Sequence, residues 1–353
     1  MRQPPARLTV GDRAPNFVLP DPRGKFQMFY ERVKGNPVAI VLCAAERAVD
    51  RAELRAFAER QAAFAAAGID LFVINRASVA ETAALVGDLD LAAPLLADPE
   101  GAVTAGFRDA AGLDGGGPVC FLLDANQRLL DLRGGATGQA DWALLRFAEL
   151  RRPVEEMRIA AVAPVLVVPR VLDRSACADL IGRWETEGHA EGTVTSMAAG
   201  EEYDRVHHAM KKRRDHSIMD PALLRALVDV IGRRLAPELD KAFGFNRFRF
   251  DRFLVTCYDA ARGDHFGVHR DNLSPGTADR RFALTLNLNS EDHDGGDLRF
   301  PEYGPHLYRP ETGAAIVFSC SLLHEALPVT RGRRFTLLSF LRAPVAAKPS
   351  DLP

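Results

Sequence analysis

Three side chains in the second half of the sequence have the chemistry to hold one metal ion together. His269 and Asp271 are two residues apart, and side chains with this spacing point to the same side of an extended chain. A single His-x-Asp pair is a weak signal, but His324 follows in the run SLLHEALPV. Two neutral imidazoles and one carboxylate bind non-heme Fe(II) on one face and leave coordination positions open for oxygen and a substrate. We therefore predict that these three residues bind a metal ion.

Arg334 lies ten residues after His324, in the run RGRRFTLLSFL. If this run is a strand, Arg334 shares a face with Leu338 and Phe340 and points inward among apolar neighbours. A buried guanidinium is tolerated only with an anionic partner, and its planar fork of donors suits a carboxylate. We therefore predict that Arg334 binds a carboxylate of a co-substrate. Arg333 has the opposite parity and should face outward.

The composition is that of an ordinary soluble protein, and the length of 353 residues favours two domains. A formal net charge of −2 gives no general attraction to nucleic acid or anionic membranes. No apolar run approaches the roughly 18 residues of a transmembrane helix, and the N-terminus lacks the apolar region of a secretory signal. Five scattered cysteines without a C-x-x-C pair suit reduced thiols. We expect a cytoplasmic protein without nucleic-acid or membrane partners.

In the first half, buried strand-like runs alternate with helical patterns, which predicts an α/β domain with parallel strand pairs at its centre. The expected strands are 37–43 and 69–77, a hairpin-like pair occupies 119–133, and the expected helices are 48–68, 78–91 and 139–152. Ser78 and Glu81 have the spacing of a capping box. Pro118 follows three glycines before a strand, which raises the suspicion of a cis peptide bond.

Many short strands separated by turn residues predict a sandwich or barrel in the second half. They occupy 248–259, 280–289, 295–300, 313–320 and 333–341. An apolar pattern of helical spacing at 221–244 precedes them, and Pro237 should kink or restart this helix. We expect domains at 1–153 and 154–353, joined at a charged stretch with a proline.

The first half, over most of residues 7–150, resembles a peroxiredoxin of the thioredoxin-like fold. The resemblance rests on VGDRAPNFVLPDPRGK, PVAIVLC and GPVCFLLDANQRLL. The peroxidatic cysteine of that family is missing, because Val49, Asp50 and Arg51 stand near its expected position. Cys43 lies earlier, inside a strand, where a buried small hydrophobe is the simpler interpretation. We expect this domain to be redox-silent and to serve in assembly or substrate docking.

The second half resembles the prolyl 4-hydroxylase-like branch of the Fe(II)- and 2-oxoglutarate-dependent dioxygenases, over about residues 250–341. The resemblance rests on Tyr258, Gly263, Phe266, His269-x-Asp271, Gly295-Gly296-x-Leu298, His324, Pro328-Val329 and Gly332-x-Arg334. It implies a double-stranded β-helix, or jelly roll, with flanking helices.

The same resemblance implies the ligands of the site. It assigns Fe(II) to His269, Asp271 and His324, and the distal carboxylate of the co-substrate 2-oxoglutarate to Arg334, so that these four are the expected catalytic residues. It also implies that the Tyr258 hydroxyl contacts 2-oxoglutarate, and it allows ascorbate as a reductant. Asn287 stands near a position where relatives often carry a tyrosine, so the polar contacts of the co-substrate can differ here.

The function that the resemblance implies is hydroxylation of a prime substrate by O2, with release of succinate and CO2. The substrate can be a small molecule, an amino acid or a peptidyl, prolyl-like residue, and a homodimer stays open. One alternative is a thiol peroxidase using Cys43, although a cysteine inside an apolar strand should have a raised pKa. Another is a non-catalytic module that senses oxygen or metal.

Other polar residues have plainer interpretations. The basic run 211–214 is by default a solvated face, and the alternative is the rim of an active-site mouth that attracts an anionic substrate. His207 and His208 are expected at the surface. His293 is expected in a loop rather than as a fourth ligand, and His265 could line the pocket.

Overall fold

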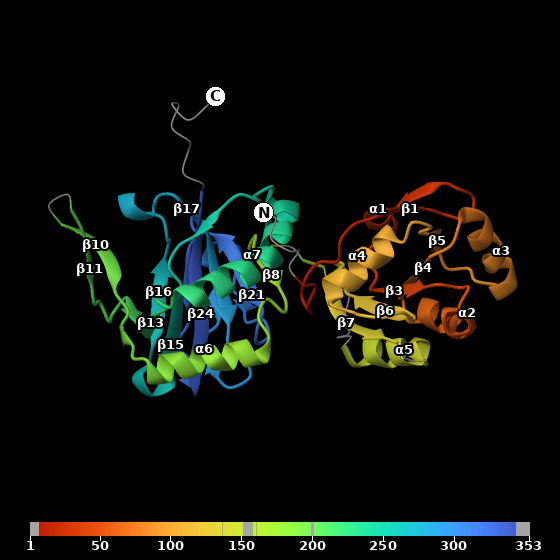
Figure 1. Ribbon diagram of the computed structural model, residues 1–353. Helices are drawn as coiled ribbons and strands as arrows, with labels where there is room; N and C mark the ends of the chain where they lie inside the picture. Colours follow the sequence, from red (N-terminus) through yellow and green to blue (C-terminus); the bar gives the residue numbers. More distant parts are fainter. Residues whose placement is uncertain (1–6, 136, 151–157, 160, 199–200, 344–353) are drawn as a thin grey trace, which may run out of the picture. The chain divides into compact units, whose positions relative to one another are not determined.

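A computed structural model describes residues 7–135, 137–150, 158–159, 161–198 and 201–343. It divides into two compact units, Met1–Glu156 and Met157–Pro353, which are coloured from red to yellow and from yellow-green to blue in Figure 1. Each unit has its own hydrophobic core. In the part of the chain that is described, no helix is long and apolar enough to cross a membrane.

The N-terminal unit is built on a five-stranded sheet in the order β5-β4-β3-β6-β7. The pairs β5–β4 and β4–β3 are parallel, whereas the pairs β3–β6 and β6–β7 are antiparallel. The parallel pairs confirm the predicted α/β class. The strands are β3 (Val38–Cys43), β4 (Asp70–Asn75), β5 (Leu95–Ala97), β6 (Val119–Leu123) and β7 (Leu129–Gly134), and a separate hairpin joins β1 (Val18–Pro20) to β2 (Phe26–Met28).

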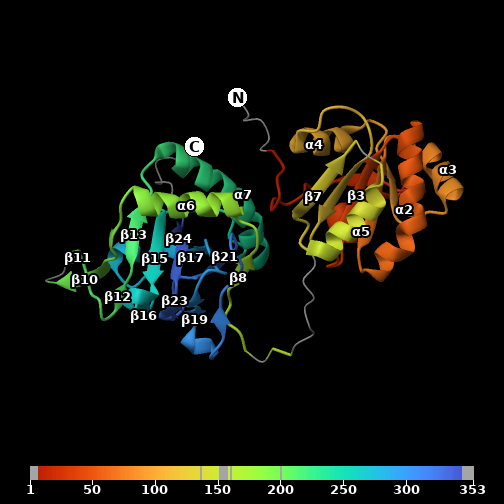
Figure 2. The ribbon, with the colours of Figure 1, turned by 90° about the horizontal axis from the view of Figure 1, so that it is seen from below.

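Helices cover both faces of this sheet because its central strand is apolar on both sides. Val41 and Cys43 of β3 pack in one core, together with residues of α2, α3 and α5, whereas Ile40 and Leu42 pack in the other with residues of α1 and α4. Figure 2 shows α4 on one side of the sheet and α2 and α5 on the other. The helices are α1 (Phe29–Arg32), α2 (Ala48–Ala66), α3 (Val79–Leu89), α4 (Ala102–Ala111) and α5 (Gln139–Leu150).

Two local predictions for this unit have opposite outcomes. The capping box is confirmed, since the Ser78 side chain accepts from the Glu81 backbone and the Glu81 carboxylate accepts from the Ser78 backbone. The suspected cis bond before Pro118 is wrong, because the described residues contain no cis peptide bond.

Two antiparallel sheets form the C-terminal unit, which has the predicted jelly-roll class of fold. The larger sheet runs β8-β21-β17-β24-β15-β13-β9, with β14 paired to β24, and the smaller runs β12-β16-β22-β19-β20. The larger contains β8 (Leu166–Val168), β9 (Ala190–Glu191), β13 (Arg214–Ser217), β14 (Arg249–Phe250), β15 (Leu254–Asp259), β17 (Arg280–Asn287), β21 (Ala315–Ser319) and β24 (Arg333–Arg342). The smaller contains β12 (Lys211–Lys212), β16 (His265–His269), β19 (Leu298–Arg299), β20 (Leu307–Tyr308) and β22 (His324–Ala326).

Short elements complete this unit. Two further antiparallel pairs form outside the sheets, and three single turns of 3-10 helix connect strands. They are β10 (Val194–Ala198) with β11 (Glu201–Arg205), β18 (Asp294–Gly295) with β23 (Val329–Arg331), η1 (Ala260–Arg262), η2 (Pro275–Thr277) and η3 (Pro301–Tyr303).

Helices α6 (Arg174–Thr186) and α7 (Pro221–Phe243) lie along one face of the larger sheet, as Figures 1 and 2 show. Apolar side chains of both helices pack against alternate residues of β15, β17, β21 and β24 in a single core. Pro237 lies inside an uninterrupted α7, so the expected restart of the helix is wrong. With one face of the larger sheet filled by helices, the other face is left to line a cavity.

Candidate metal and co-substrate site

The three predicted metal ligands converge because two strands pair. His269 is the last residue of β16 and His324 the first of β22, and the antiparallel register places them opposite one another. Asp271 follows β16 by two residues and lies against both rings. Its Oδ1 is 3.5 Å from the His269 Nε2, and its Oδ2 is 3.4 Å from the His324 Nε2. One ligand atom from each residue lies within 4.8 Å of the other two.

Backbone carbonyls fix the tautomer of both imidazoles. The His269 Nδ1 is 2.7 Å from the carbonyl of Gly267, and the His324 Nδ1 is 2.9 Å from the carbonyl of Leu322. Since a carbonyl can only accept, both Nδ1 atoms carry the proton, and both Nε2 lone pairs face Asp271. A metal-binding histidine usually has this arrangement, in which the second ring nitrogen donates to a fixed acceptor.

The surroundings of the triad favour a neutral His324 imidazole and an ionised Asp271 carboxylate. Burial lowers the pKa of His324. Burial alone would raise the pKa of Asp271, but the contacts with His269 and His324 and the charge of Arg280 lower it below its ordinary value. Phe266 stacks on His269 with ring centroids 3.5 Å apart, which makes this side of the site apolar. Ligand atoms bound at about 2.1 Å and at right angles would lie about 3.0 Å apart, so the donor set fits a transition metal after a small contraction.

The triad opens into a cavity of about 470 Å³, which also receives Arg334. Arg334 is 3% exposed, whereas its neighbour Arg333 is exposed and forms an ion pair with Glu185 at 2.7 Å. Leu338 and Phe340 line the cavity together with Arg334. The predicted strand parity is therefore confirmed. Among the residues described, no carboxylate lies within ion-pairing distance of the Arg334 guanidinium and none accepts a hydrogen bond from it.

A glycine makes room for the Arg334 side chain. Gly296 has φ +72°, and a Cβ atom added there would lie 2.8 Å from both the Arg334 Cδ and the Val329 Cγ2. Atoms at that distance overlap, so a side chain at position 296 would displace Arg334. Gly296 of the Gly295-Gly296 turn thus allows Arg334 to take its place in the cavity wall.

Tyr258 connects Arg334 to a second buried arginine. The Tyr258 hydroxyl is 2.9 Å from the Arg213 Nη1, and both guanidinium groups lie over its ring, at 5.6 Å for Arg213 and 5.3 Å for Arg334. A tyrosine hydroxyl can accept one hydrogen bond and donate another. Because Arg213 donates to it, the hydroxyl retains its own proton for a ligand in the cavity.

Comparison with known families agrees with both halves of the chain. Residues 253–342 match the 2OG-Fe(II) oxygenase superfamily, and residues 10–130 match the AhpC/TSA family. The N-terminal part of the chain is thus similar to the AhpC/TSA family and the C-terminal part to the 2OG-Fe(II) oxygenase superfamily. Both resemblances predicted from the sequence are thereby confirmed.

Among curated relatives, a PKHD-type hydroxylase of Synechococcus sp. (strain JA-2-3B'a(2-13)) is 35% identical over 98 residues, which are 26% of this chain and 42% of that protein. Another PKHD-type hydroxylase, from Janthinobacterium sp. (strain Marseille), is 27% identical over 196 residues, which are 52% of this chain and 80% of that protein. This chain thus spans less than half the length of the first of these relatives.

Two solved structures are each similar to a part of this chain. A Pseudomonas putida prolyl-4-hydroxylase is 21% identical, with a TM-score of 0.39, and the match covers 52% of this chain and 94% of that one. Peroxidoxin BcpB from Mycobacterium tuberculosis is 23% identical, with a TM-score of 0.38, and the match covers 41% of this chain and 100% of that one.

The basic run 211–214 is not the fully solvated face that the sequence predicted. Lys211 and Arg213 are 7% and 5% exposed and line the cavity, so the expected solvated face is wrong for these two. Lys212 and Arg214 point elsewhere, to the carbonyl of Arg262 and to Asp259. Lys211 and Arg213 have the same parity in an extended segment, and this alternation was the signal that sequence reasoning did not use.

The remaining polar candidates of the C-terminal unit lie around the site without joining the triad. His207 and His208 are exposed as expected, and His207 lies at the cavity wall. His293 is buried in its loop, where burial and the charge of Arg334 lower its pKa to about 4. His265 is near the carbonyls of Gly263 and Ala209, and Asn287 donates to the carbonyl of Pro310. Neither belongs to the described lining of the cavity.

In the N-terminal unit, Cys43 is the cysteine nearest in sequence to the expected position of the peroxidatic cysteine, and it is buried in the core. Cys43 is 2% exposed, and burial with the nearby Asp50 and Glu46 charges raises its pKa strongly. Asp50 is buried in the first turn of α2 and accepts a hydrogen bond from the Ala44 backbone at 2.7 Å. A carboxylate in this place holds the strand end to the helix and has no thiol chemistry.

Proposed function

We propose that the chain is an Fe(II)- and 2-oxoglutarate-dependent oxygenase that hydroxylates a small-molecule, amino-acid or peptidyl, prolyl-like substrate and releases succinate and CO2. In this proposal His269, Asp271 and His324 hold the metal, and Arg334 and Tyr258 bind 2-oxoglutarate. The observation that carries the proposal is that one cavity contains both the tautomer-fixed triad and a buried guanidinium for which the described residues offer no anionic partner.

Each of these residues has a role that follows from its chemistry. The two Nε2 lone pairs and the Asp271 carboxylate offer one negative and two neutral donors, which occupy one face of an ion. When bound there, ferrous iron would supply the redox chemistry by which O2 converts 2-oxoglutarate to succinate and CO2 and oxygenates the substrate. Arg334 then holds the distal carboxylate through charge-assisted hydrogen bonds, which remove the penalty of its own burial.

The cavity walls limit water at the reacting centre. Phe318 lies edge-on against the His324 ring, with centroids 4.6 Å apart, and Phe266 covers the His269 ring. On the larger sheet, Thr336 is fully buried and its hydroxyl is 2.7 Å from that of Thr256. One of these hydroxyls donates to the other, and Arg334 and Tyr258 offer further polar contacts on the cavity wall for an organic acid.

The test is binding and turnover of 2-oxoglutarate by the full chain. The anaerobic protein with Fe(II) and 2-oxoglutarate should show the visible charge-transfer absorption of a chelated 2-oxo acid, and air should then give succinate even without a prime substrate. His269→Ala should abolish both signals. Arg334→Ala should weaken 2-oxoglutarate binding by about tenfold or more, since a hydrogen bond to a charged group contributes about 1.5–3 kcal/mol.

Arg333→Ala is the matched control, because that side chain lies on the other face of the same strand. It should leave 2-oxoglutarate binding unchanged. Absence of both absorption and succinate in the wild-type protein would refute the proposal. Absorption without succinate, over a broad range of substrates, would instead favour a non-catalytic module that senses oxygen or metal.

The buried state of Cys43 speaks against the thiol peroxidase. Peroxide reduction needs an accessible thiolate, whereas the Cys43 thiol is buried and has a raised pKa. We expect Cys43→Ser to leave any peroxide turnover of the preparation unchanged. A loss of turnover in this variant would restore the peroxidase hypothesis.

A further inference from the structure

The oxygenase cavity contains more buried positive charge than the metal and 2-oxoglutarate account for. Lys211 and Arg213 are both buried in its wall, and they share one carboxylate, Asp215. The Arg213 guanidinium contacts both oxygens of Asp215, at 2.8 Å through Nε and 3.2 Å through an Nη. The Lys211 Nζ is farther away, at 3.7 Å. Asp215 is therefore mainly the partner of Arg213, and among the residues that the structure describes no other anion lies nearer to Lys211.

A count of charges shows what is missing. Asp271 leaves a divalent ion with one positive charge, which the chelating carboxylate of 2-oxoglutarate neutralises. The distal carboxylate neutralises Arg334, and Asp215 neutralises Arg213. The charge of Lys211 is left over. A buried ammonium without an anion is unfavourable, so such a site is suited to a ligand that brings an anionic group.

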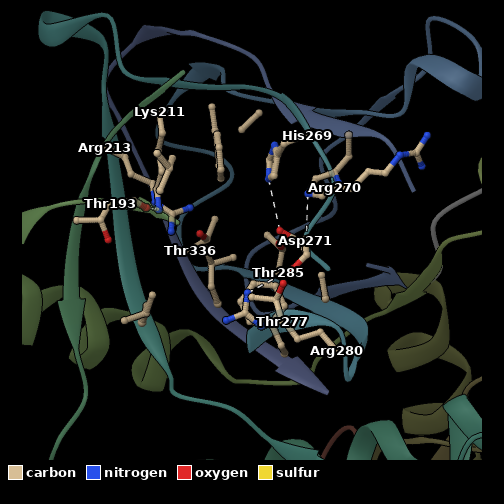
Figure 3. A pocket seen from close by; sticks show the side chains of 18 of the residues that line it. Thr193, Lys211, Arg213, His269, Arg270, Asp271, Thr277, Arg280, Thr285 and Thr336 are labelled. Atoms are coloured by element: carbon tan, nitrogen blue, oxygen red, sulfur yellow. Dashed lines mark hydrogen bonds and ion pairs between the residues drawn. The ribbon is translucent and has the colours of Figure 1, made fainter. Parts of the chain in front are cut away.

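The Lys211 side chain lines this cavity, and its ammonium has three donors. One of its three protons is taken by the Thr193 carbonyl at 2.7 Å, and Asp215 is too distant to take a second strongly. Its Nζ lies 5.1 Å from the centroid of Phe266, the ring that stacks on His269. Figure 3 shows Thr193, Lys211 and Arg213 on one side of the cavity, facing His269 and Asp271 across it. A single aromatic ring thus separates the ammonium from a metal ligand.

The rest of the lining has the same sign of charge. Seven lysine and arginine side chains line the cavity, and Asp271 is the single carboxylate among the described lining residues. Arg252 is exposed there, and within the described structure its guanidinium has no ion-pair or hydrogen-bond partner. The chain as a whole has a net charge of −2, so this concentration is local. A cavity lined by one sign of charge attracts ligands of the opposite sign.

We propose that the prime substrate is a small acid whose carboxylate or phosphate group binds to Lys211, with Arg252 attracting it to the cavity, while the carbon to be oxidised faces the triad. This rests on the proposed function. The cavity of about 470 Å³ is within the roughly 300–1,000 Å³ of small-molecule sites, and it must also hold 2-oxoglutarate. In the reaction, one oxygen atom of O2 enters succinate and the other enters the substrate C–H bond, so the acid group is a handle and stays unchanged.

The experiment compares acids with their neutral isosteres on the loaded protein. The anaerobic full chain with Fe(II) and 2-oxoglutarate is titrated calorimetrically with cyclopentanecarboxylate and cyclopentanecarboxamide, 4-methylpentanoate and 4-methylpentanamide, benzoate and benzamide, and glycerol 3-phosphate and glycerol. We expect acids to bind about tenfold or more tightly than their neutral partners, because a charge-assisted contact in a desolvated site is lost in the neutral partner. A stronger preference for the phosphate than for any carboxylate would assign the group as phosphate.

Variants of the basic run connect the preference to one side chain. Lys211→Met should abolish the preference for acids, and Lys211→Arg should restore most of it, which separates loss of charge from loss of folding. Lys212→Met is the matched control, because its ammonium donates to the Arg262 carbonyl outside the cavity. It should retain the full preference. Arg252→Gln should slow association of the acid and weaken its salt dependence.

Three outcomes would overturn the proposal: equal binding of acids and neutral partners, no binding by any acid of the panel, or a preference that survives in Lys211→Met. Tighter binding of a blocked acidic peptide than of every small acid would overturn the small-molecule class. Each titration is preceded by the Fe(II)–2-oxoglutarate absorption of the same sample. If that absorption is absent, the failure belongs to the proposed oxygenase function and not to the acid site.

Discussion

The Tyr258 hydroxyl accepts a hydrogen bond from the Arg213 Nη1 at 2.9 Å, although 45 residues separate them in the chain. This contact joins the part of the cavity that we assign to 2-oxoglutarate to the part that we assign to the acid substrate. Burial opposes the charge of Arg213, but Asp215 and Tyr258 raise its pKa, so the guanidinium is permanently charged and always the donor. The hydroxyl proton of Tyr258 is therefore directed at a different acceptor.

We expect Tyr258 and Arg213 to act together on 2-oxoglutarate binding. Tyr258→Phe removes the donor to the co-substrate, and Arg213→Gln removes the group that orients it. Each should raise the KM for 2-oxoglutarate, and the double variant should be less impaired than the sum of the two effects. Contacting residues typically show coupling energies of about 0.5–3 kcal/mol. Strict additivity in the four-protein cycle would show that the contact has no part in binding.

Gly296→Ala should weaken 2-oxoglutarate binding without touching the metal. The added methyl group would overlap the Arg334 Cδ, at 2.8 Å, and move the guanidinium. We expect the KM for 2-oxoglutarate to rise by about tenfold, which corresponds to about 1.4 kcal/mol of lost interaction. Gly263→Ala is the control, since Gly263 has a similar φ of +65° but open space around the added atom. The hypothesis fails if both variants raise the KM equally, because backbone strain would then be the cause.

Lys211→Met should stabilise the ligand-free protein in a way that depends on pH. Burial and the charge of Arg213 lower the pKa of Lys211 from 10.5 to about 7, with Arg252 adding to this effect and Asp215 and Asp271 opposing it. A lysine whose pKa is lower in the folded than in the unfolded state destabilises the fold fully below about pH 7. This effect diminishes as the pH rises from about 7 towards 10.5.

Urea unfolding of Lys211→Met and wild type at pH 6 and pH 9 measures this difference. The variant should gain more free energy of unfolding at pH 6 than at pH 9. In Lys212→Met the difference from wild type should be the same at both pH values. A gain for Lys211→Met that did not change with pH would mean that the buried ammonium is already satisfied.

A divalent metal should stabilise the fold through the triad. Mn(II) avoids oxidation and suits the same donors, and a ligand at 100 times its Kd adds about 2.7 kcal/mol to the free energy of unfolding. We expect Mn(II) to raise the Tm of the wild type and to have little effect on Asp271→Asn, which lacks the charged ligand. Asp294→Asn is the control, because Asp294 is exposed and paired with Arg331. An equal rise in Asp271→Asn would place the metal elsewhere.

The sequence by itself predicted the candidate donor set and determined the class of each domain. Side chains two apart in a strand share a face, so the pairing of His269 with Asp271 and the inward direction of Arg334 followed from parity alone. Apolar runs alternating with helical periods indicated the α/β domain, because both patterns depend only on residues that are near one another in the sequence. The burial of Cys43 was also predictable, because this residue stands inside an apolar strand.

Only the tertiary structure decided which charges meet. Parity shows that Lys211 and Arg213 share a face, but it does not show whether that face meets water or another sheet. The antiparallel pairing of β12 with β16 turned it inward, opposite the triad, and buried two of four basic residues that looked solvated. The bond from Arg213 to Tyr258 depends on another pairing, that of β13 with β15, which places Arg214 beside Cys257. Contacts of this kind between distant segments are set by how strands pair and not by local pattern.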